Sequence, residues 1–202
     1  MDIKIINNIP GIQATMNESA DGNIEISITK KPVRKLSEFK PGETVTIGQR
    51  EYIVLSQGKD TTAVIAKKFA KKMVFGSNGD WRESDVRKYC NGEFYNELAA
   101  AIGAENIIEH TVNLMGDDGT GKGIACKDKV SILTTELYRR YREYLSAYGD
   151  WWWTATRLTW EDPDYARDVR YVDSRGILSW GDCHCDGGVR PFCVLNSSIS
   201  IS

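Results

Sequence analysis

Three cysteines and a histidine close to the C-terminus are the residues whose chemistry is easiest to define. Cys183, His184 and Cys185 are consecutive, and Cys193 follows a short distance later. Sites built from Cys and His side chains are typical of tetrahedral zinc. Only one residue separates Cys183 from Cys185, however, which is tighter than the usual spacing of zinc ligands, and no second pair lies nearby in the sequence. We therefore expect thiols in a loop and no zinc site.

A group of acidic residues in the same quarter of the chain offers oxygen ligands of the kind that calcium prefers. These residues are Glu161, Asp162, Asp164 and Asp182. Acidic side chains are mostly exposed in proteins, so a solvated acidic loop is the simpler interpretation. We therefore expect a solvated loop and no cofactor.

A glycine-rich segment at residues 116–123 comes one residue short of the phosphate-binding P-loop pattern. Gly123 stands where a Ser or Thr must coordinate magnesium. The residues that follow lead into a predicted strand, so no helix N-terminus is available to hold a phosphate group. We expect a surface loop that binds no nucleotide.

Groups suited to acid–base or nucleophilic catalysis are few. The chain has two histidines, His110 and His184, and neither lies in a recognisable nucleophile motif. The acidic residues of the loop at 161–168 define no catalytic pair. Because an enzyme needs such groups set together in a pocket, we expect a binding protein rather than an enzyme.

The overall composition is that of a soluble, folded protein. Of the 202 residues, 41% are hydrophobic and 27% are charged, and the net charge is −2. Nucleic acid and anionic membranes are disfavoured as partners, because binding to them needs clustered positive charge. No apolar run approaches the length of a membrane span or a signal peptide. We expect a chain made in the cytosol, with its five cysteines reduced by default.

The N-terminal part, residues 1–40, predicts an arm that is separate from the main domain. Residues 23–29 alternate between polar and apolar types, as an exposed strand or hairpin does, and Pro32 and Pro41 indicate a linker. Such an arm is suited to attachment, either to other proteins or to further copies of this chain. The main domain is expected at residues 41–202.

Strands open the main domain, and helices follow them. Short β-branched runs at residues 44–47, 52–55 and 63–66 predict a β-meander. Apolar residues at three- and four-residue steps predict one or two short helices within residues 84–102, with Ser84 capping the first turn.

Strands with loops between them dominate the rest of the chain. We expect strands at residues 107–114, 130–133, 152–156, 169–173, 177–180 and 189–195. One further helix, capped by Thr134 or Thr135, is expected to run towards Gly149. Together these elements predict an α+β fold with an irregular, aromatic-rich β end.

Several short motifs follow one another in an order that resembles a known family. The first are Tyr52, Ile53, Val54 and Leu55, then Trp81, Ser84 and Arg87, then Asn91, Phe94 and Tyr95. After them come Asp128, Lys129 and Val130, then Trp152, Trp153 and Thr156, then Val172 and Gly176, and last Gly188, Val189, Arg190 and Pro191. This order is similar to that of small bacterial and phage domains related to the C-type-lectin-like variable proteins that retroelements diversify. The similarity covers roughly residues 40–195.

The resemblance implies a C-type-lectin-like fold with a mixed antiparallel sheet, two or three helices and long irregular C-terminal loops. It also implies a sequence-tolerant binding face between Thr156 and Asp186. Tyr, Trp and Arg dominate recognition hot spots, and this stretch is rich in them. The expected ligand-binding residues are Arg157, Trp160, Tyr165, Arg167, Arg170, Tyr171, Asp173, Trp180, Asp182 and His184. For the tryptophans the alternative is a place in the core, which we favour for Trp152 and leave open for Trp160 and Trp180.

Two related groups of proteins offer further alternatives. The calcium-binding lectins are similar at Trp180 and Asp182, and their Pro-centred acidic motif is similar to Asp162, Pro163 and Asp164. This resemblance implies calcium at Asp162, Asp164 and Asp182 as the alternative to no cofactor, but Gly181 stands where the lectins carry an Asn ligand. A lectin-like disulfide would join Cys90 to Cys193. The formylglycine-generating oxidases share this fold and use a cysteine pair near the C-terminus, for which Cys185 and Cys193 are the candidates, but their surrounding signature is absent.

The function that the resemblance implies is receptor binding by a component of a phage or prophage virion. In a tail or tail fibre, the variable face would attach to a host-surface protein or glycan, and residues 1–40 would join other virion proteins or form a homo-oligomer. A purely structural virion protein is the rival interpretation, and a cytoplasmic protein is the alternative location. Whether a retroelement diversifies residues 156–186 is decided by the neighbouring DNA.

Overall fold

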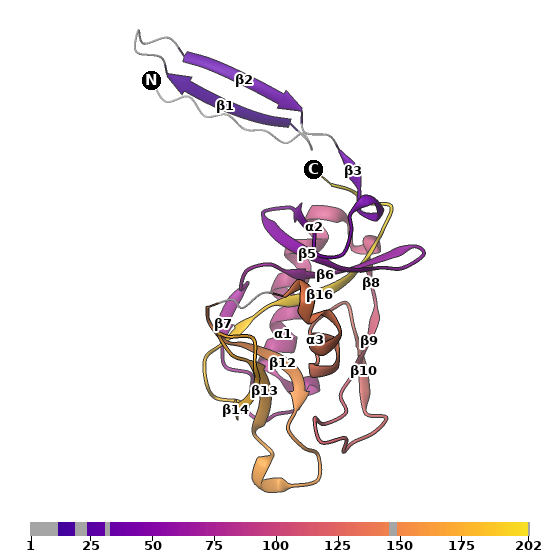
Figure 1. Ribbon diagram of the computed structural model, residues 1–202, viewed down its shortest axis with the longest axis vertical. Coiled ribbons are helices and arrows are strands. Elements are labelled where there is room, and N and C mark those ends of the chain that lie inside the picture. The colour runs from indigo at the N-terminus through magenta and orange to yellow at the C-terminus, as the bar shows by residue number, and fades with distance from the viewer. Residues whose placement is uncertain (1–11, 19–23, 31–32, 146–148, 202) are drawn as a thin grey trace.

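The computed structural model describes residues 12–18, 24–30, 33–145 and 149–201 (Figure 1). The strands before the first helix are β1 (Ile12–Glu18), β2 (Ile24–Lys30), β3 (Arg34–Lys35), β4 (Thr44–Ile47), β5 (Arg50–Gln57), β6 (Thr61–Ala66) and β7 (Lys71–Met73). The helices are α1 (Asp85–Tyr89), α2 (Tyr95–Ile102) and α3 (Thr135–Tyr141), and a π-helical turn, Cys90–Phe94, joins the first two. The later strands are β8 (Ile107–Ile108), β9 (His110–Asn113), β10 (Ala125–Asp128), β11 (Val130–Ile132), β12 (Trp152–Arg157), β13 (Asp168–Val172), β14 (Leu178–Asp182), β15 (Gly187–Val189), β16 (Pro191–Asn196) and β17 (Ser200–Ile201). This mixture confirms the predicted α+β class.

The larger sheet contains the predicted meander. Its strand order is β11-β16-β6-β5-β4, with β8 paired to β16, and every pairing is antiparallel. The two short helices predicted within residues 84–102 are present as α1 and α2. As expected, Ser84 is the N-cap of α1, and its hydroxyl accepts a hydrogen bond from the backbone N–H of Arg87 at 3.0 Å.

The second sheet holds the C-terminal strands in the order β14-β13-β12-β15-β7. Three of its four pairings are antiparallel, but β15 runs parallel to β12, with Gly188 opposite Trp152. A Cβ atom at Gly187 would lie 2.5 Å from Nε1 of Trp153, so only glycine lets the two strands approach this closely.

The prediction of a single strand at residues 189–195 is wrong. The chain forms two strands there, because it passes from one sheet to the other at Arg190. Strand β15 belongs to the second sheet, and β16 to the larger one. The Arg190 side chain is buried at this corner, where its Nε donates to the Ala66 carbonyl at 3.1 Å and its guanidinium carbon lies 5.0 Å from the Trp152 ring centroid. Pro191 follows directly and starts β16, where a missing N–H is tolerated.

The arm divides into two parts. Strands β1 and β2 form the predicted hairpin, which extends away from the body of the molecule in Figure 1, while residues 1–11, 19–23 and 31–32 lie outside the described part. From β3 onward the chain belongs to the body, since β3 pairs with β17 and Leu36 is fully buried. The body therefore begins before residue 41, the expected boundary.

Aromatic side chains fill much of the core. Trp81, Trp152 and Trp153 are almost fully buried, as expected for Trp152. The Trp152 ring packs edge-on against Tyr138 of α3, and the Trp153 ring packs against Phe75. These contacts place α3 and the residues before α1 on the second sheet.

Smaller differences concern the middle of the chain. The strand predicted at 107–114 is divided into β8 and β9, and β9 pairs with β10, which the sequence pattern did not indicate. The helix capped by Thr134 ends at Tyr141 and continues as a 3-10 turn, Arg142–Tyr144, whereas residues 146–148 lie outside the described part. Within the described residues, no helix combines the length and apolar character needed to cross a membrane.

Candidate binding face

The β13–β14 hairpin separates the predicted ligand-binding residues between its two faces. Cross-strand partners share a face of a sheet, and the register pairs Arg170 with Trp180 and Tyr171 with Ser179. Tyr171 lies on the inner face, where its ring centroid is 4.9 Å from that of Trp151. Arg170 and Trp180 lie on the opposite face, which we call the outer face of β13–β14.

Trp180 is the most exposed aromatic side chain of the described residues, at 53%. The guanidinium carbon of Arg170 lies 5.5 Å from the centroid of its ring, a cation–π distance. Large apolar side chains at this exposure leave contact area free for a partner, and the guanidinium limits the orientations that the indole can adopt. Arg170 and Trp180 together thus offer an exposed aromatic contact for a partner.

Asp117 forms an ion pair with the Arg170 side chain. One carboxylate oxygen lies 2.7 Å from Nη2 of Arg170, and the other lies 2.9 Å from Nη2 of Arg139 on α3. The Asp117 side chain is only 9% exposed, so this interaction is largely shielded from solvent screening. The backbone N–H of Asp117 also donates to the Arg157 carbonyl at 3.1 Å, which fixes the loop to the end of β12.

A shallow cavity of about 130 Å³ lies beside this cluster. Its lining includes Asp117, Thr134, Thr156 and Arg139. Hydroxyl, carboxylate and guanidinium groups therefore line this cavity, and Asp117 is the residue that links it to Arg170.

Three further predicted residues, Arg167, Asp182 and His184, lie close together at the end of the β13–β14 hairpin away from its turn. We call them the rim of the outer face. The Asp182 carboxylate accepts hydrogen bonds from the backbone N–H of His184 at 2.9 Å and from its ring at Nδ1, 2.7 Å away. These bonds lower the pKa of Asp182 below its ordinary value. Arg167 lies 3.9 Å from the same carboxylate. Asp168 is directly opposite Asp182 in the ladder, and desolvation together with this like charge raises its pKa.

Four other predicted residues belong to the framework that supports this face. Nε1 of Trp160 donates to the Leu114 carbonyl at 2.7 Å, and Arg157 covers the Trp160 ring at 4.8 Å. Tyr171 packs inward, as described above. Asp173 closes the hairpin turn by accepting from the backbone N–H groups of Ile177 and Arg175, which lowers the pKa of Asp173.

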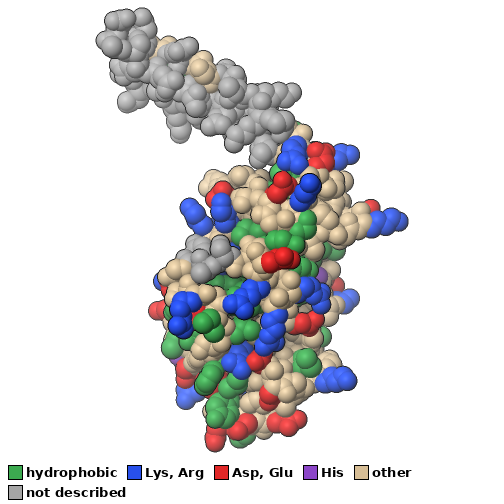
Figure 2. All heavy atoms as spheres, in the orientation of Figure 1, with side chains coloured by type: hydrophobic (Ala, Val, Ile, Leu, Met, Phe, Trp, Pro, Cys, Tyr) green, Lys and Arg blue, Asp and Glu red, His purple; other side chains and the backbone are tan. Residues whose placement is uncertain are grey.

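Tyr165 is separate from both groups. It ends the short 3-10 turn Pro163–Tyr165 in the loop after β12 and is 42% exposed. Figure 2 shows hydrophobic side chains gathering at this lower end of the body, with Lys and Arg side chains directly above them. At the end of the molecule remote from the β1–β2 hairpin, hydrophobic side chains therefore lie among both basic and acidic side chains (Figure 2).

The predicted calcium ligands do not come together. Asp162 caps the 3-10 turn in the loop by accepting from the backbone N–H of Asp164 at 2.9 Å. In the described part of the chain, the group of potential metal ligands that lie close to one another comprises Asp182, Cys183 and His184, and neither Asp162 nor Asp164 joins it.

The same three residues do not form a nucleophile–base pair. Cys183 Sγ and Asp182 Oδ1 both face Nδ1 of His184, at 3.8 and 2.7 Å, so one ring nitrogen would have to serve both. Burial raises the pKa of the Cys183 thiol to about 11, which disfavours the reactive thiolate.

The remaining cysteines are dispersed. Cys185 is exposed, whereas Cys193 is fully buried within β16, and the pKa of its thiol is raised by burial. Cys90 is buried in the same core cluster as Cys193, and both are free thiols. The structure thus holds no disulfide between Cys90 and Cys193.

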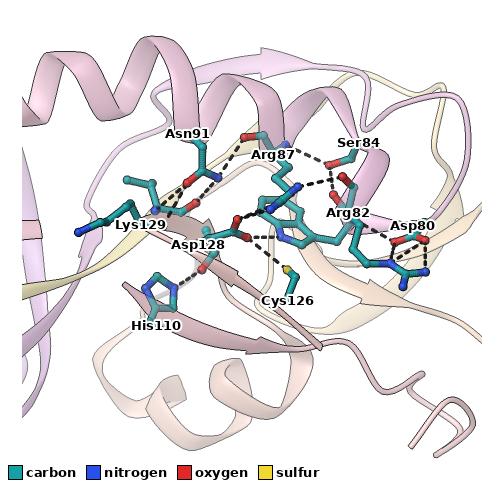
Figure 3. Close-up of polar contacts among 12 residues, drawn as sticks. Asp80, Arg82, Ser84, Arg87, Asn91, His110, Cys126, Asp128 and Lys129 are labelled. Carbon is teal, nitrogen blue, oxygen red and sulfur yellow. Dashed lines mark hydrogen bonds and ion pairs between the residues drawn. The ribbon is translucent and has the colours of Figure 1, made fainter. Parts of the chain in front are cut away.

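The earlier motifs of the family-like pattern form a polar network (Figure 3). The buried Asp128 carboxylate accepts from Nε1 of Trp81 and from Nε of Arg87, each at 2.8 Å, and from Cys126 Sγ at 3.4 Å. The amide of Asn91 donates to the Val130 carbonyl at 2.8 Å. These motif residues therefore join α1 and the following turn to β10 and β11.

Comparison of the chain with protein-family models, curated proteins and solved structures finds no match. The function is accordingly argued from the residues. Sequence reasoning did not select Asp117 or Arg139, which complete the Arg170–Trp180 cluster. Asp117 lies in the loop at 116–123, whose glycines indicated only a surface loop, and nothing in the spacing relates it to β13.

Proposed function

We propose that the chain is a binding protein with a C-type-lectin-like fold, and that it recognises a partner through the outer face of β13–β14. The contacts between motif residues support the fold. Trp81 and Arg87 meet Asp128, and Arg190 meets Trp152, so the residues that carry the resemblance are also the residues that join the elements.

The observation that carries the function is the exposed Trp180 held by Arg170 and Asp117. Aromatic and Arg residues supply most of the binding energy in protein interfaces. Here the arginine is fixed by a largely buried carboxylate, so little side-chain entropy is lost when a partner binds. Arg167, Asp182 and His184 add a polar rim of the kind that surrounds such contact points.

The partner class that we propose is a host-surface protein or glycan, with display on a phage or prophage tail as the setting. This part rests on the resemblance of the motifs alone. We propose binding that does not depend on calcium, since Asp162 and Asp164, two ligands of the alternative calcium site, lie outside the group formed by Asp182, Cys183 and His184.

The test is attachment of the fluorescently labelled full chain to intact cells of candidate bacterial hosts, followed by glycan-array screening. We expect Trp180→Ala to weaken attachment at least about thirtyfold, the cost of losing a hot-spot aromatic residue. Asp117→Asn, which releases Arg170, is expected to weaken it less. Ile177→Ala is the matched control, since Ile177 is 48% exposed at the turn of the same hairpin.

Two results would contradict the proposal. One is equal attachment by the Trp180→Ala and Ile177→Ala variants. The other is normal attachment by Trp180→Ala together with loss of the chain from assembled particles, which would assign the face to contacts within a virion. Unchanged thermal unfolding of both variants would exclude misfolding as the cause.

A further inference from the structure

The β1–β2 hairpin has one apolar face and one polar face. Its antiparallel register places Ala14 opposite Ile28 and Met16 opposite Ile26. Because residues opposite each other share a face, the apolar face contains Ile12, Ala14, Met16, Ile24, Ile26 and Ile28. The polar face contains Gln13, Thr15, Asn17, Glu25, Ser27 and Thr29. Apart from Glu18 and Lys30 at the two ends of the apolar face, this alternation is typical of a strand pair that is buried on one side only.

The body of the molecule leaves the apolar face uncovered at Ile24 and Ile26, the two isoleucines of this face whose exposure is described. Ile24 is 45% exposed and Ile26 is 48% exposed. In Figure 1 the hairpin extends away from the sheets and helices. An isolated two-stranded hairpin is marginally stable in water, and a sheet with one apolar face must bury it against another element.

Charged positions on the apolar face suit a second copy of the same hairpin. Glu18 stands at one end of the face, opposite Ile24, and Lys30 stands at the other end, opposite Ile12. When two copies stack face to face about a twofold axis, with their strands antiparallel, the Glu18 end of each lies over the Lys30 end of the other. The surface is therefore complementary to itself in both charge and hydrophobicity, as a twofold interface requires.

We infer that the chain self-associates through the apolar face of β1–β2, in a twofold arrangement that brings Glu18 of one copy to Lys30 of the other. The interface is small, since the face spans four cross-strand pairs, and association is therefore concentration-dependent. The inference is independent of the proposed function. If the proposed function also holds, each dimer carries two outer faces of β13–β14. Linking two weak binding sites in this way raises the overall affinity for a surface with repeated ligands.

Sedimentation velocity of the full chain over a concentration series tests this inference. We expect the wild type to shift from monomer to dimer and Ile26→Lys to remain monomeric over the same range. The dissociation constant should rise about a thousandfold, because each of the two copies loses a buried isoleucine. Ser27→Lys is the matched control, since it adds the same charge on the polar face. Thermal unfolding of the body should be the same for all three proteins.

Charge exchange distinguishes this arrangement from other modes of association. Glu18→Lys and Lys30→Glu should each weaken the dimer, because like charges then face each other, and the double variant should restore it. Wild-type protein that stays monomeric throughout the series would overturn the inference, as would a dimer that Ile26→Lys leaves intact. A dimer insensitive to the charge reversals would refute the antiparallel arrangement.

Discussion

Replacement of Asp128 by Asn measures how strongly the polar network holds the helices to the strands. The carboxylate is 2% exposed and accepts from three donors, on Trp81, Arg87 and Cys126. An Asn side chain has nearly the same shape but one acceptor oxygen fewer. Its amide nitrogen must then face either the indole N–H or the guanidinium, so a donor meets a donor in a buried site.

The loss of stability expected for Asp128→Asn follows from the ion pair between Asp128 and Arg87. Removing one member of a buried ion pair destabilises a protein by about 3–5 kcal/mol. The Arg87 side chain is 32% exposed and can regain some hydration, so the lower end of this range, about 3 kcal/mol, is expected. For a chain of this length, that loss corresponds to a fall of about 6–12 °C in the unfolding midpoint.

Urea unfolding followed by tryptophan fluorescence provides the assay, with calorimetry for the midpoint. Glu93→Gln is the matched control, because Glu93 pairs with Lys71 at 3.5 Å but its side chain is 71% exposed. Exposed pairs contribute about 0–1 kcal/mol, so this variant should be nearly as stable as the wild type. A loss of less than about 1 kcal/mol in Asp128→Asn would refute the reasoning, since the buried network would then act like a surface pair.

Two further predictions concern pH and packing. Burial lowers the pKa of His110 from 6.5, so the unfolded state takes up a proton that the folded state does not. Stability should therefore be full above pH 6.5 and fall below it by at most about 1.4 kcal/mol per pH unit, and His110→Gln should reduce this slope in urea titrations. Gly187→Ala should cost about 2–3 kcal/mol, because the added Cβ would lie 2.5 Å from the Trp151 and Trp153 rings, whereas Gly92→Ala, with no atom within 4 Å, should be neutral or stabilising. Equal unfolding midpoints for the two alanine variants would contradict the packing argument.

Much of the fold could be predicted from local patterns. The β-branched runs of β4, β5 and β6 and the capped start of α1 are local signals, and each is present in the structure. The division of the last strand was not predictable in the same way. Residues 189–195 were predicted as one strand, and the change of sheet depends on the buried contacts of Arg190 with Ala66 and Trp152, which are distant in sequence.

The candidate site was predictable in residue type but not in arrangement. Composition selected a stretch rich in Arg, Trp and Tyr, and within that stretch Trp180 is exposed in the structure. The same types serve as framework at Trp160 and Tyr171, because one makes a hydrogen bond to Leu114 and the other faces Trp151. Which aromatic side chain is exposed follows from strand register, and register is set by pairing between β13 and β14 rather than by composition.

The pairing of β3 with β17 has a practical consequence for the body as a unit. Arg34 lies opposite Ile201, so the polypeptide enters and leaves the body at neighbouring points. Both points lie at the end near the β1–β2 hairpin, whereas strands β13 and β14 lie in the lower half of the body in Figure 1. Domains whose ends are adjacent tolerate insertion into a host protein and circular permutation. The body can therefore be inserted into a surface loop of another protein through the adjacent ends of β3 and β17, and β13–β14 would lie away from the points of insertion.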